Sequence, residues 1–377
     1  MSEYQYYEFH SIDRMLSEKE QAEIDTWSSR ASPTSRSVSF TYNYGDFSRD
    51  EKKVVLKYFD AGFYYADWGT KRLLFRLPAD LVDLKTLQKY DYGEEYEFSL
   101  EISGNKEYVL IDMYYQEDGG FSQWIEGEGT LPTLLSLRDD LLKGDYRCLF
   151  LFWLSIKKMD YDIDDLKLDE KIPANMIPPN LKKLNTGLKN LIDFFEMDMD
   201  WINSVAAYSE DSTIKEEKGD DALKQIQALP QKLKDDYLLR LVKGEINLDY
   251  KFKKELKTKK ATSNNKSPEV SFSTLIGQSN EVEQERIAAQ KEKERKAHLK
   301  KLKEVEANKE RTLASIQINI TQGNSKSYDE ALQEIISLKE LAIHKKEEAE
   351  FQKYIDGLKK KYSRKSSLIR RFRENDL

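Results

Sequence analysis

The chain has 377 residues, of which 34% are charged and 39% are hydrophobic, and its formal net charge is −7. This length suits two or more domains of ~100–200 residues, and the low apolar share argues against a single compact globule. The one cysteine, Cys148, excludes an internal disulfide and a thiolate zinc site. The longest apolar run, 148–156, is far shorter than the ~20 residues of a membrane span, and the N-terminus lacks a signal-peptide pattern. We therefore expect a cytoplasmic protein without membrane contact.

Charge is unevenly distributed along the chain. Residues 1–170 contain 20 Lys and Arg and 34 Asp and Glu, which is a net charge of −14. Residues 171–377 contain 41 basic and 34 acidic residues, which is a net charge of +7. An acidic first part and a basic second part predict a different partner for each.

The first 160 residues hold most of the aromatic residues, which usually anchor a core. Alternating aromatic and apolar residues predict strands, and apolar residues spaced by three or four predict helices. The predicted strands lie at 4–12, 37–44 and 71–78, with a hairpin over 96–115. The predicted helices lie at 17–30, 48–63, 79–90 and 130–144. The apolar run 146–158 fits a buried helix or a strand, and its length and charged flanks favour the helix. We therefore expect an α+β fold class, with a mixed α/β domain of about five strands over 1–160.

The densest aromatic stretch is "YFDAGFYYADWGTKRLLFRLP", residues 58–78. Its pattern predicts one apolar helix face, a tight link at the Gly-Thr pair, and a strand that enters the sheet. The alternative is a surface patch for a partner, formed by Trp68, Arg72 and Arg76. Alternation places the two arginines on one face of the predicted strand.

The amino-acid composition changes twice in the middle of the chain. The acidic and then proline-rich segment 160–178 predicts a linker or wrapping loop. Leucines at helical spacing begin at Leu181, and we expect a small helical domain over 178–258. The polar segment 259–280 has no periodicity, which predicts a flexible linker.

A long charged helix is predicted over 281–320, because this segment contains no Gly or Pro and is rich in Glu, Lys, Arg and Ala. Its first half has almost no apolar stripe, so we expect a solvated helix there and packing in the second half. The interrupted apolar pattern does not favour a homodimeric coiled coil. Two more amphipathic helices follow. The pattern of residues 281–377 therefore predicts this long helix and a C-terminal antiparallel helical bundle.

Several stretches along the chain resemble a family of uncharacterised bacterial proteins. In chain order they are "YYEFHSIDRMLSEKE", "YADWGTKRLLFRLP", "WIEGEGTLPTLLSLRDDLLKGDYRCLFLFWL", "IPPNLKKLNTGLKNLIDFF", "SYDEALQEIISLKELA" and "YSRKSSLIRRFREN". This resemblance spans nearly the whole chain and implies no activity and no catalytic residues. The C-terminal helices are also similar to a segment of some bacterial SWIM zinc-finger proteins. The zinc motif of those proteins needs several cysteines, so it does not carry over.

Motifs for cofactors and nucleophiles are missing from the sequence. It contains no GxxxxGK[ST], no strand-linked GxGxxG and no GxSxG. The three histidines lie on separate predicted elements, which argues against a metal cluster. Cys148 lies in an apolar run, where a thiol usually packs and does not react. We expect no cofactor and no metal, and an enzyme is the less favoured class.

Acidic residues give the best case for catalysis. Glu101 and Asp112 lie on the two strands of the predicted hairpin, and Glu126 follows. Carboxylates on adjacent strands can hold Mg²⁺ for phosphodiester cleavage. Metal nucleases of this kind usually carry a lysine shortly after the second acid, and Met113 follows Asp112 here. The alternative is that these acids line the solvent face of a half-buried hairpin.

The last 19 residues give the sharpest signal for binding. Residues 359–373 contain eight basic residues and no acidic residue. They are Lys359, Lys360, Lys361, Arg364, Lys365, Arg370, Arg371 and Arg373. Basic groups gain affinity for a phosphate backbone by releasing counterions, and the interleaved Tyr362 and Phe372 could stack on bases. The alternative is that this segment docks on acidic surfaces of its own bundle or of a partner chain.

Three functions remain open after the sequence. The first is a non-enzymatic, multidomain interaction or scaffold protein, in which the α/β domain and the C-terminal bundle bind different proteins. The second is a nucleic-acid-associated accessory factor of a bacterial DNA-metabolism or defence system. The third is a metal-dependent nuclease built on the hairpin acids.

Overall fold

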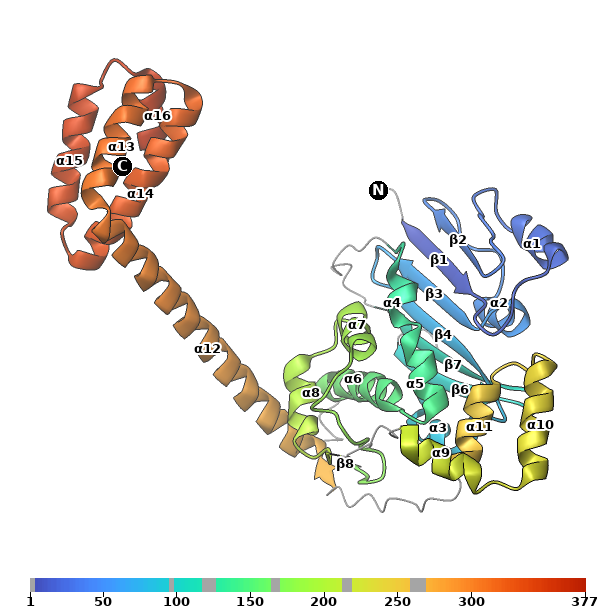
Figure 1. The fold of residues 1–377 in the computed structure, drawn as a ribbon. Helices are drawn as coiled ribbons and strands as arrows, with labels where there is room; N and C mark the ends of the chain where they lie inside the picture. Colours follow the sequence, from blue (N-terminus) through green and yellow to red (C-terminus); the bar gives the residue numbers. More distant parts are fainter. Residues whose placement is uncertain (1–3, 95–97, 117–126, 164–169, 212–218, 258–268) are drawn as a thin grey trace. The chain divides into compact units, whose positions relative to one another are not determined.

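The computed structural model describes residues 4–94, 98–116, 127–163, 170–211, 219–257 and 269–377. Figure 1 shows the strands and helices along the chain. The chain divides into two compact units, Met1–Val282 and Glu283–Leu377, here called unit 1 and unit 2. The α+β fold class is confirmed, since a sheet and several helices form unit 1 and helices form unit 2.

A seven-stranded antiparallel sheet is the centre of unit 1. Its strands are β1 (Gln5–His10), β2 (Ser37–Tyr42), β3 (Ala61–Ala66), β4 (Lys71–Pro78), β5 (Tyr92–Glu94), β6 (Phe98–Gly104) and β7 (Tyr108–Tyr115). They lie in the order β2-β1-β3-β4-β7-β6-β5. The predicted strands at 4–12, 37–44 and 71–78 and the predicted hairpin are confirmed. Two strands, β3 and β5, raise the predicted number of about five to seven.

The predicted helix over 48–63 is wrong in its second half. Helix α2 (Glu51–Tyr58) ends where the Phe59 amide bonds to the Val55 carbonyl, and β3 begins at Ala61. Aromatic residues at 63–65 favour a strand. Gly62 also lets β3 pass close to α2, because a Cβ there would lie 2.7 Å from Val55 Cγ2. The helical spacing of apolar residues therefore runs from a helix into a strand, which is why the predicted helix is too long.

Helices cover both faces of the sheet. On one face lie α4 (Thr130–Leu134), α5 (Ser136–Lys143), α6 (Arg147–Ile163), α7 (Thr186–Phe194) and α8 (Met199–Ala206). They share one core with the sheet, which includes Phe75, Ile111, Phe150 and Trp201. The other face packs against α1 (Glu18–Asp25) and α2 through a second cluster that includes Phe9, Phe40, Val55 and Leu74. Two short turns of helix, α3 (Leu84–Leu87) and η1 (Gln88–Tyr90), precede β5.

The segments predicted as a separate helical domain and a linker lie within unit 1. Helices α7 and α8 contribute to the core of the sheet, and α9 (Gly219–Gln227), α10 (Gln231–Val242) and α11 (Leu248–Lys257) follow them. Strand β8 (Lys171–Ile172) pairs with β9 (Val270–Ser271). Phe272 is fully buried against Trp153 and Trp201. Residues 270–280 of the predicted linker are therefore strand and helix, because buried side chains hold them to the core, whereas residues 259–268 of that linker lie outside the described residues.

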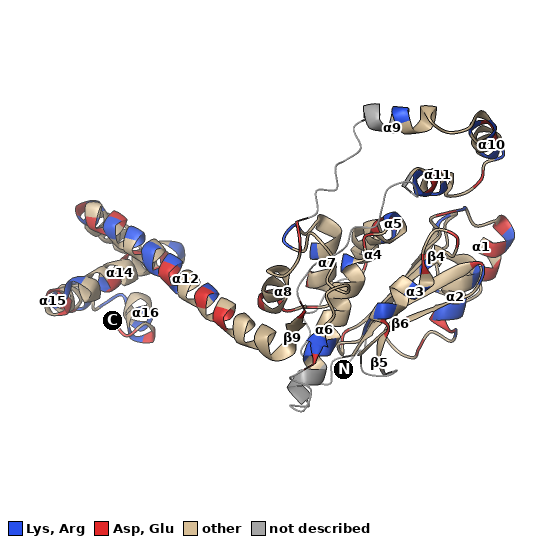
Figure 2. Ribbon diagram, turned by 90° about the horizontal axis from the view of Figure 1, so that it is seen from below, with Lys and Arg blue, Asp and Glu red and all other residues tan. Residues whose placement is uncertain are grey.

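Unit 2 is a helical bundle. Helix α12 (Phe272–Ala307) crosses the boundary between the units and carries both charge signs along its length (Figure 2). The others are α13 (Lys309–Gln322), α14 (Ser325–Lys345), α15 (Glu348–Lys361) and α16 (Ser366–Glu374). The predicted single helix over 281–320 is interrupted at Asn308, and α14 contacts α13, α15 and α16. Leu368 and Phe372 of α16 are fully buried, so α16 belongs to the bundle core.

The edge strand β2 is covered by the loop before it. The Ser37 carbonyl accepts from the Thr34 amide at 2.7 Å, and the Ser37 amide donates to Thr34 Oγ1 at 2.9 Å. Arg30 Nη1 donates to the Thr41 carbonyl at 3.1 Å. Three outward-facing backbone groups near the two ends of β2, at Ser37 and Thr41, are thus bonded within the same chain.

Candidate functional site

The two hairpin acids are brought together, with a lysine between them. Glu101 of β6 and Asp112 of β7 are direct partners in the sheet register. Lys52 of α2 forms an ion pair with Glu101, and its Nζ lies 3.1 Å from Asp112 Oδ2. Burial lowers the pKa of Lys52, but hydrogen bonds to the two acids outweigh this effect and raise it overall. The lysine therefore stays charged and offsets part of the negative charge of the two acids.

Arg72 completes a charged network on this face of the sheet. Its Nε and Nη2 donate to the two Asp112 carboxylate oxygens at 2.8 and 2.7 Å, and its Nη1 lies 3.1 Å from Glu51 Oε2. Burial raises the pKa of Glu51, and Arg72 only partly opposes this. Asp112 is buried, with its two oxygens bonded to Arg72 and Lys52. The arrangement ties α2 to β4 and β7 through charge-assisted bonds.

A metal site does not form around these acids within the described residues. No group of three or more His, Cys, Asp or Glu side chains there is placed to hold a metal ion. The third predicted acid, Glu126, lies outside the described residues. Burial raises the pKa of the Cys148 thiol, which keeps it protonated and unreactive.

The three residues predicted as a partner surface make different contacts within unit 1. Arg72 bonds to Asp112, as described above. Arg76 Nη2 and Nε donate to Asp60 Oδ1 at 2.7 and 3.2 Å, and Asp60 is fully buried. Trp68 lies half-buried in the turn between β3 and β4, where its indole N–H donates to Thr70 Oγ1 at 2.9 Å. The two guanidinium groups thus face acids inside unit 1.

The eight predicted nucleic-acid-binding residues divide into two groups. Three contact the bundle: Lys361 Nζ lies 2.9 Å from Gln317 Oε1, Lys365 Nζ lies 2.7 Å from the Ile320 carbonyl, and Arg371 Nε lies 2.7 Å from Asp329 Oδ1. The other five have exposed or half-exposed side chains. They are Lys359, Lys360, Arg364, Arg370 and Arg373. Part of the basic segment therefore holds the bundle together, and part faces solvent.

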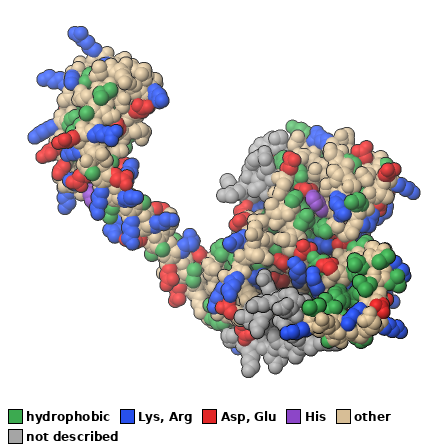
Figure 3. All heavy atoms as spheres, in the orientation of Figure 1, with side chains coloured by type: hydrophobic (Ala, Val, Ile, Leu, Met, Phe, Trp, Pro, Cys, Tyr) green, Lys and Arg blue, Asp and Glu red, His purple; other side chains and the backbone are tan. Residues whose placement is uncertain are grey.

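An apolar surface that the sequence did not predict lies on α10. Leucines at helical spacing usually mark a buried stripe, yet α10 contains no buried residue. Four of its apolar side chains, here called the α10 face, are more than half exposed. They are Leu238, Leu239, Leu241 and Val242. Figure 3 shows apolar side chains gathered on this part of the surface.

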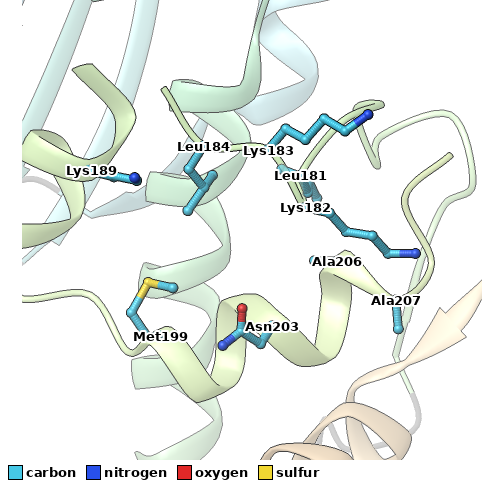
Figure 4. Close-up of a pocket in the computed structure, with 9 residues that line it drawn as sticks. All are labelled: Leu181, Lys182, Lys183, Leu184, Lys189, Met199, Asn203, Ala206 and Ala207. Atoms are coloured by element: carbon cyan, nitrogen blue, oxygen red, sulfur yellow. The ribbon is translucent and has the colours of Figure 1, made fainter. Parts of the chain in front are cut away.

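A groove of about 540 Å³ lies between the segment 181–184, α7 and α8. Leu184, Met199 and Asn203 point into it (Figure 4). Three of its nine lining residues are lysines and none is Asp or Glu. Its lining thus combines apolar side chains with positive charge and no negative charge, which favours a negatively charged group.

Comparisons with known proteins add no assignment. A scan of protein-family models, a search of curated proteins and a search of solved structures each found no match. The resemblance to a bacterial family and to SWIM-protein segments stays a prediction. Among the described helices, none combines the length and apolar character needed to cross a membrane.

Proposed function

We propose that the chain is an interaction protein that binds another protein through the α10 face. The observation that carries this proposal is the exposure of Leu238, Leu241 and Val242, whose exposed fractions are 60%, 64% and 84%. These residues lie at positions i, i+3 and i+4 of one helix, so they share a side of it. Contiguous apolar patches on a protein surface are typical of binding sites, because covering them releases water.

A rigid support strengthens the case for the α10 face. Tyr237 of α10 packs on Phe252 of α11 with ring centroids 4.7 Å apart. Helix α11 is fixed to the rest of unit 1, since Tyr250 donates to Asp139 at 2.9 Å and Lys251 Nζ lies 3.0 Å from Asp80. A preorganised surface loses less conformational entropy on binding than a mobile one. The face thus suits a partner helix or groove of complementary shape.

The nuclease alternative has less support from the geometry. Lys52 and Arg72 lie against Glu101 and Asp112, and their charges compete with a metal ion for the same oxygens. A framework role for this network needs no ligand, because every one of these side chains has a protein partner.

The test compares three full-length proteins. The face variant carries Leu238→Asp, Leu241→Asp and Val242→Asp. The control variant carries Ile318→Asp and Ile343→Asp, which are 58% and 53% exposed on α13 and α14. A partner is recovered from the native cells with the wild type, purified, and titrated by calorimetry against each protein.

We expect the face variant to bind the partner at least ~10-fold more weakly, because charge in a covered apolar surface is costly, and the control to bind as the wild type does. Circular dichroism should show unchanged folding, since α10 contributes no buried residue. Equal binding by the face variant would contradict the proposal. A wild-type dimer in light scattering that only the face variant dissociates would replace the partner by a second copy of the chain.

A further inference from the structure

Unit 2 carries an excess of positive charge that is concentrated at one end of its sequence. Residues 283–377 contain 23 Lys and Arg and 17 Asp and Glu, a net charge of +6. Eight of these cations lie in residues 359–373, where there is no acid. In α12, by contrast, basic and acidic residues alternate, and pairs such as Arg295 with Glu292 at 2.7 Å neutralise each other.

Three of the eight cations have a structural use and are here called the packed set. Lys365 Nζ caps the C-terminal end of α13 through the Ile320 carbonyl at 2.7 Å, where the helix dipole favours a cation. Lys361 binds Gln317 of the same helix, and Arg371 binds Asp329 of α14. These contacts, with the buried Leu368 and Phe372, fix the segment to the bundle.

The other five cations are here called the solvent set. They are Lys359, Lys360, Arg364, Arg370 and Arg373. Only Arg370 has an acidic neighbour among the ion pairs of the described residues, Glu374 at 3.6 Å, and both of those side chains are mostly exposed. Because the packed set and the core hold the backbone that carries them, the solvent set is presented from folded helix ends and the turn between them.

Of the two aromatic residues of this segment, one is buried and the other is half-buried and bonded to the bundle. Phe372 is fully buried in the bundle core. The Tyr362 hydroxyl donates to Gln317 Oε1 at 2.8 Å, and Lys361 Nζ lies 5.1 Å from its ring centroid. Stacking on unpaired bases needs an open ring face, so the geometry disfavours single strands. Arginine and lysine without aromatics are typical of contacts to a duplex backbone.

We infer that the solvent set binds the phosphate backbone of duplex nucleic acid without sequence preference. Three of its five members are arginines, whose planar guanidinium matches two phosphate oxygens at once. Five neutralised phosphates correspond to a slope of about −4.5 in log affinity against log salt on duplex DNA. This site is separate from the α10 face and goes beyond the proposed function.

The experiment uses full-length protein and a labelled 30-base-pair duplex DNA, with anisotropy measured from ~25 to ~200 mM NaCl. The test variant replaces all five members of the solvent set by Gln. The control variant makes the same charge change on α12 and α13, where the replaced side chains are also exposed. Its substitutions are Lys291→Gln, Lys293→Gln, Lys300→Gln, Lys303→Gln and Arg311→Gln.

We expect the wild type and the control to bind the duplex with a steep salt slope. The test variant should lose at least ~10-fold in affinity at low salt and show a slope flattened by about 4, while its thermal melting stays unchanged because the packed set is intact. An equal loss of affinity in the control variant would show that only the net charge of the protein matters, and it would contradict the proposed site. Tighter binding of a 30-nucleotide single strand, or no duplex binding at 25 mM NaCl, would also contradict the proposal. Equal binding of poly-glutamate would contradict it too, because the surface would then suit acidic proteins as well as nucleic acid.

Discussion

Asp60 lies fully buried just before β3 and binds groups from two other parts of the chain. Its Oδ2 accepts from the backbone amides of Ile12 and Asp13 at 2.7 and 2.9 Å, and its Oδ1 accepts from Arg76. Arg138, also buried, donates to Asp13 Oδ2 at 2.7 Å. Removing one partner of a buried ion pair costs about 3–5 kcal/mol. Charge in unit 1 is thus largely a means of joining elements.

Glu20 shows how such a contact responds to pH. It accepts from Arg14 Nη1 and Nη2 at 2.8 and 2.7 Å and from the Ser17 amide at 2.8 Å. The hydrogen bonds from Arg14 lower the pKa of Glu20 to about 2, from 4.5. A carboxylate with a lowered folded pKa stabilises the fold above its unfolded pKa, and this contribution is lost as the pH falls towards the folded pKa.

Glu20→Gln should therefore lower the free energy of unfolding at pH 7 by about 1 kcal/mol, since the pair is partly exposed and screened. The difference from the wild type should shrink as the pH falls from 4.5 towards 2. Urea unfolding at pH 7, 4 and 3 measures it. Glu18→Gln, an exposed neighbour on the same helix, serves as the control. A difference that stays constant with pH would contradict the assigned cause.

The contact between α2 and β3 sets the packing at the scale of elements. Gly62 has no Cβ, and one would lie 2.7 Å from Val55 Cγ2 and 3.1 Å from Phe9 Cδ1. Gly62→Ala should destabilise unit 1 by about 1–3 kcal/mol, because the neighbours are buried and cannot move freely. The matched change Gly357→Ala, in α15 with open space around it, should stabilise unit 2 by up to about 1 kcal/mol. Calorimetric melting of both variants distinguishes these signs, and a neutral Gly62→Ala would show that α2 can shift.

The elements that the sequence predicted are those with local signals. The hairpin pattern placed Glu101 and Asp112 on adjacent strands, and the structure pairs them directly. The contributions of Lys52 and Arg72 could not be predicted, because they come from elements distant in sequence. Helical spacing ran through Gly62 because α2 and β3 are both buried, and burial does not reveal element type.

The exposure of α10 also could not be predicted from the sequence. A leucine pattern indicates that a face avoids water, but not whether the same chain or another one covers it. Val242 is 84% exposed, although the apolar spacing around it in the sequence resembles the spacing in α7, where the apolar residues are buried. The distinction depends on which elements surround the helix, which is tertiary information.

At the scale of the whole molecule, the chain consists of two units with separate cores. Between Glu283 and Lys301 nearly every side chain of α12 is exposed, so this part has few contacts beyond its own backbone bonds. Segments without tertiary contacts open with low free energy. Limited trypsin digestion should therefore cut first within 286–303 and leave fragments close to units 1 and 2, as mass spectrometry would show. An uncut α12 after one of the units has been degraded would contradict this.

The loop bonds to β2 have a consequence for solubility. An open edge strand offers amides and carbonyls to any other extended chain, and sheets grow into fibrils by such additions. The β2 sequence "SVSFTY" has high strand propensity and no charge of its own. With Thr34 and Arg30 bonded to Ser37 and Thr41, a second molecule would first have to displace a guanidinium and a folded loop. Both ends of the β2 edge are thus protected from the strand addition that starts a fibril.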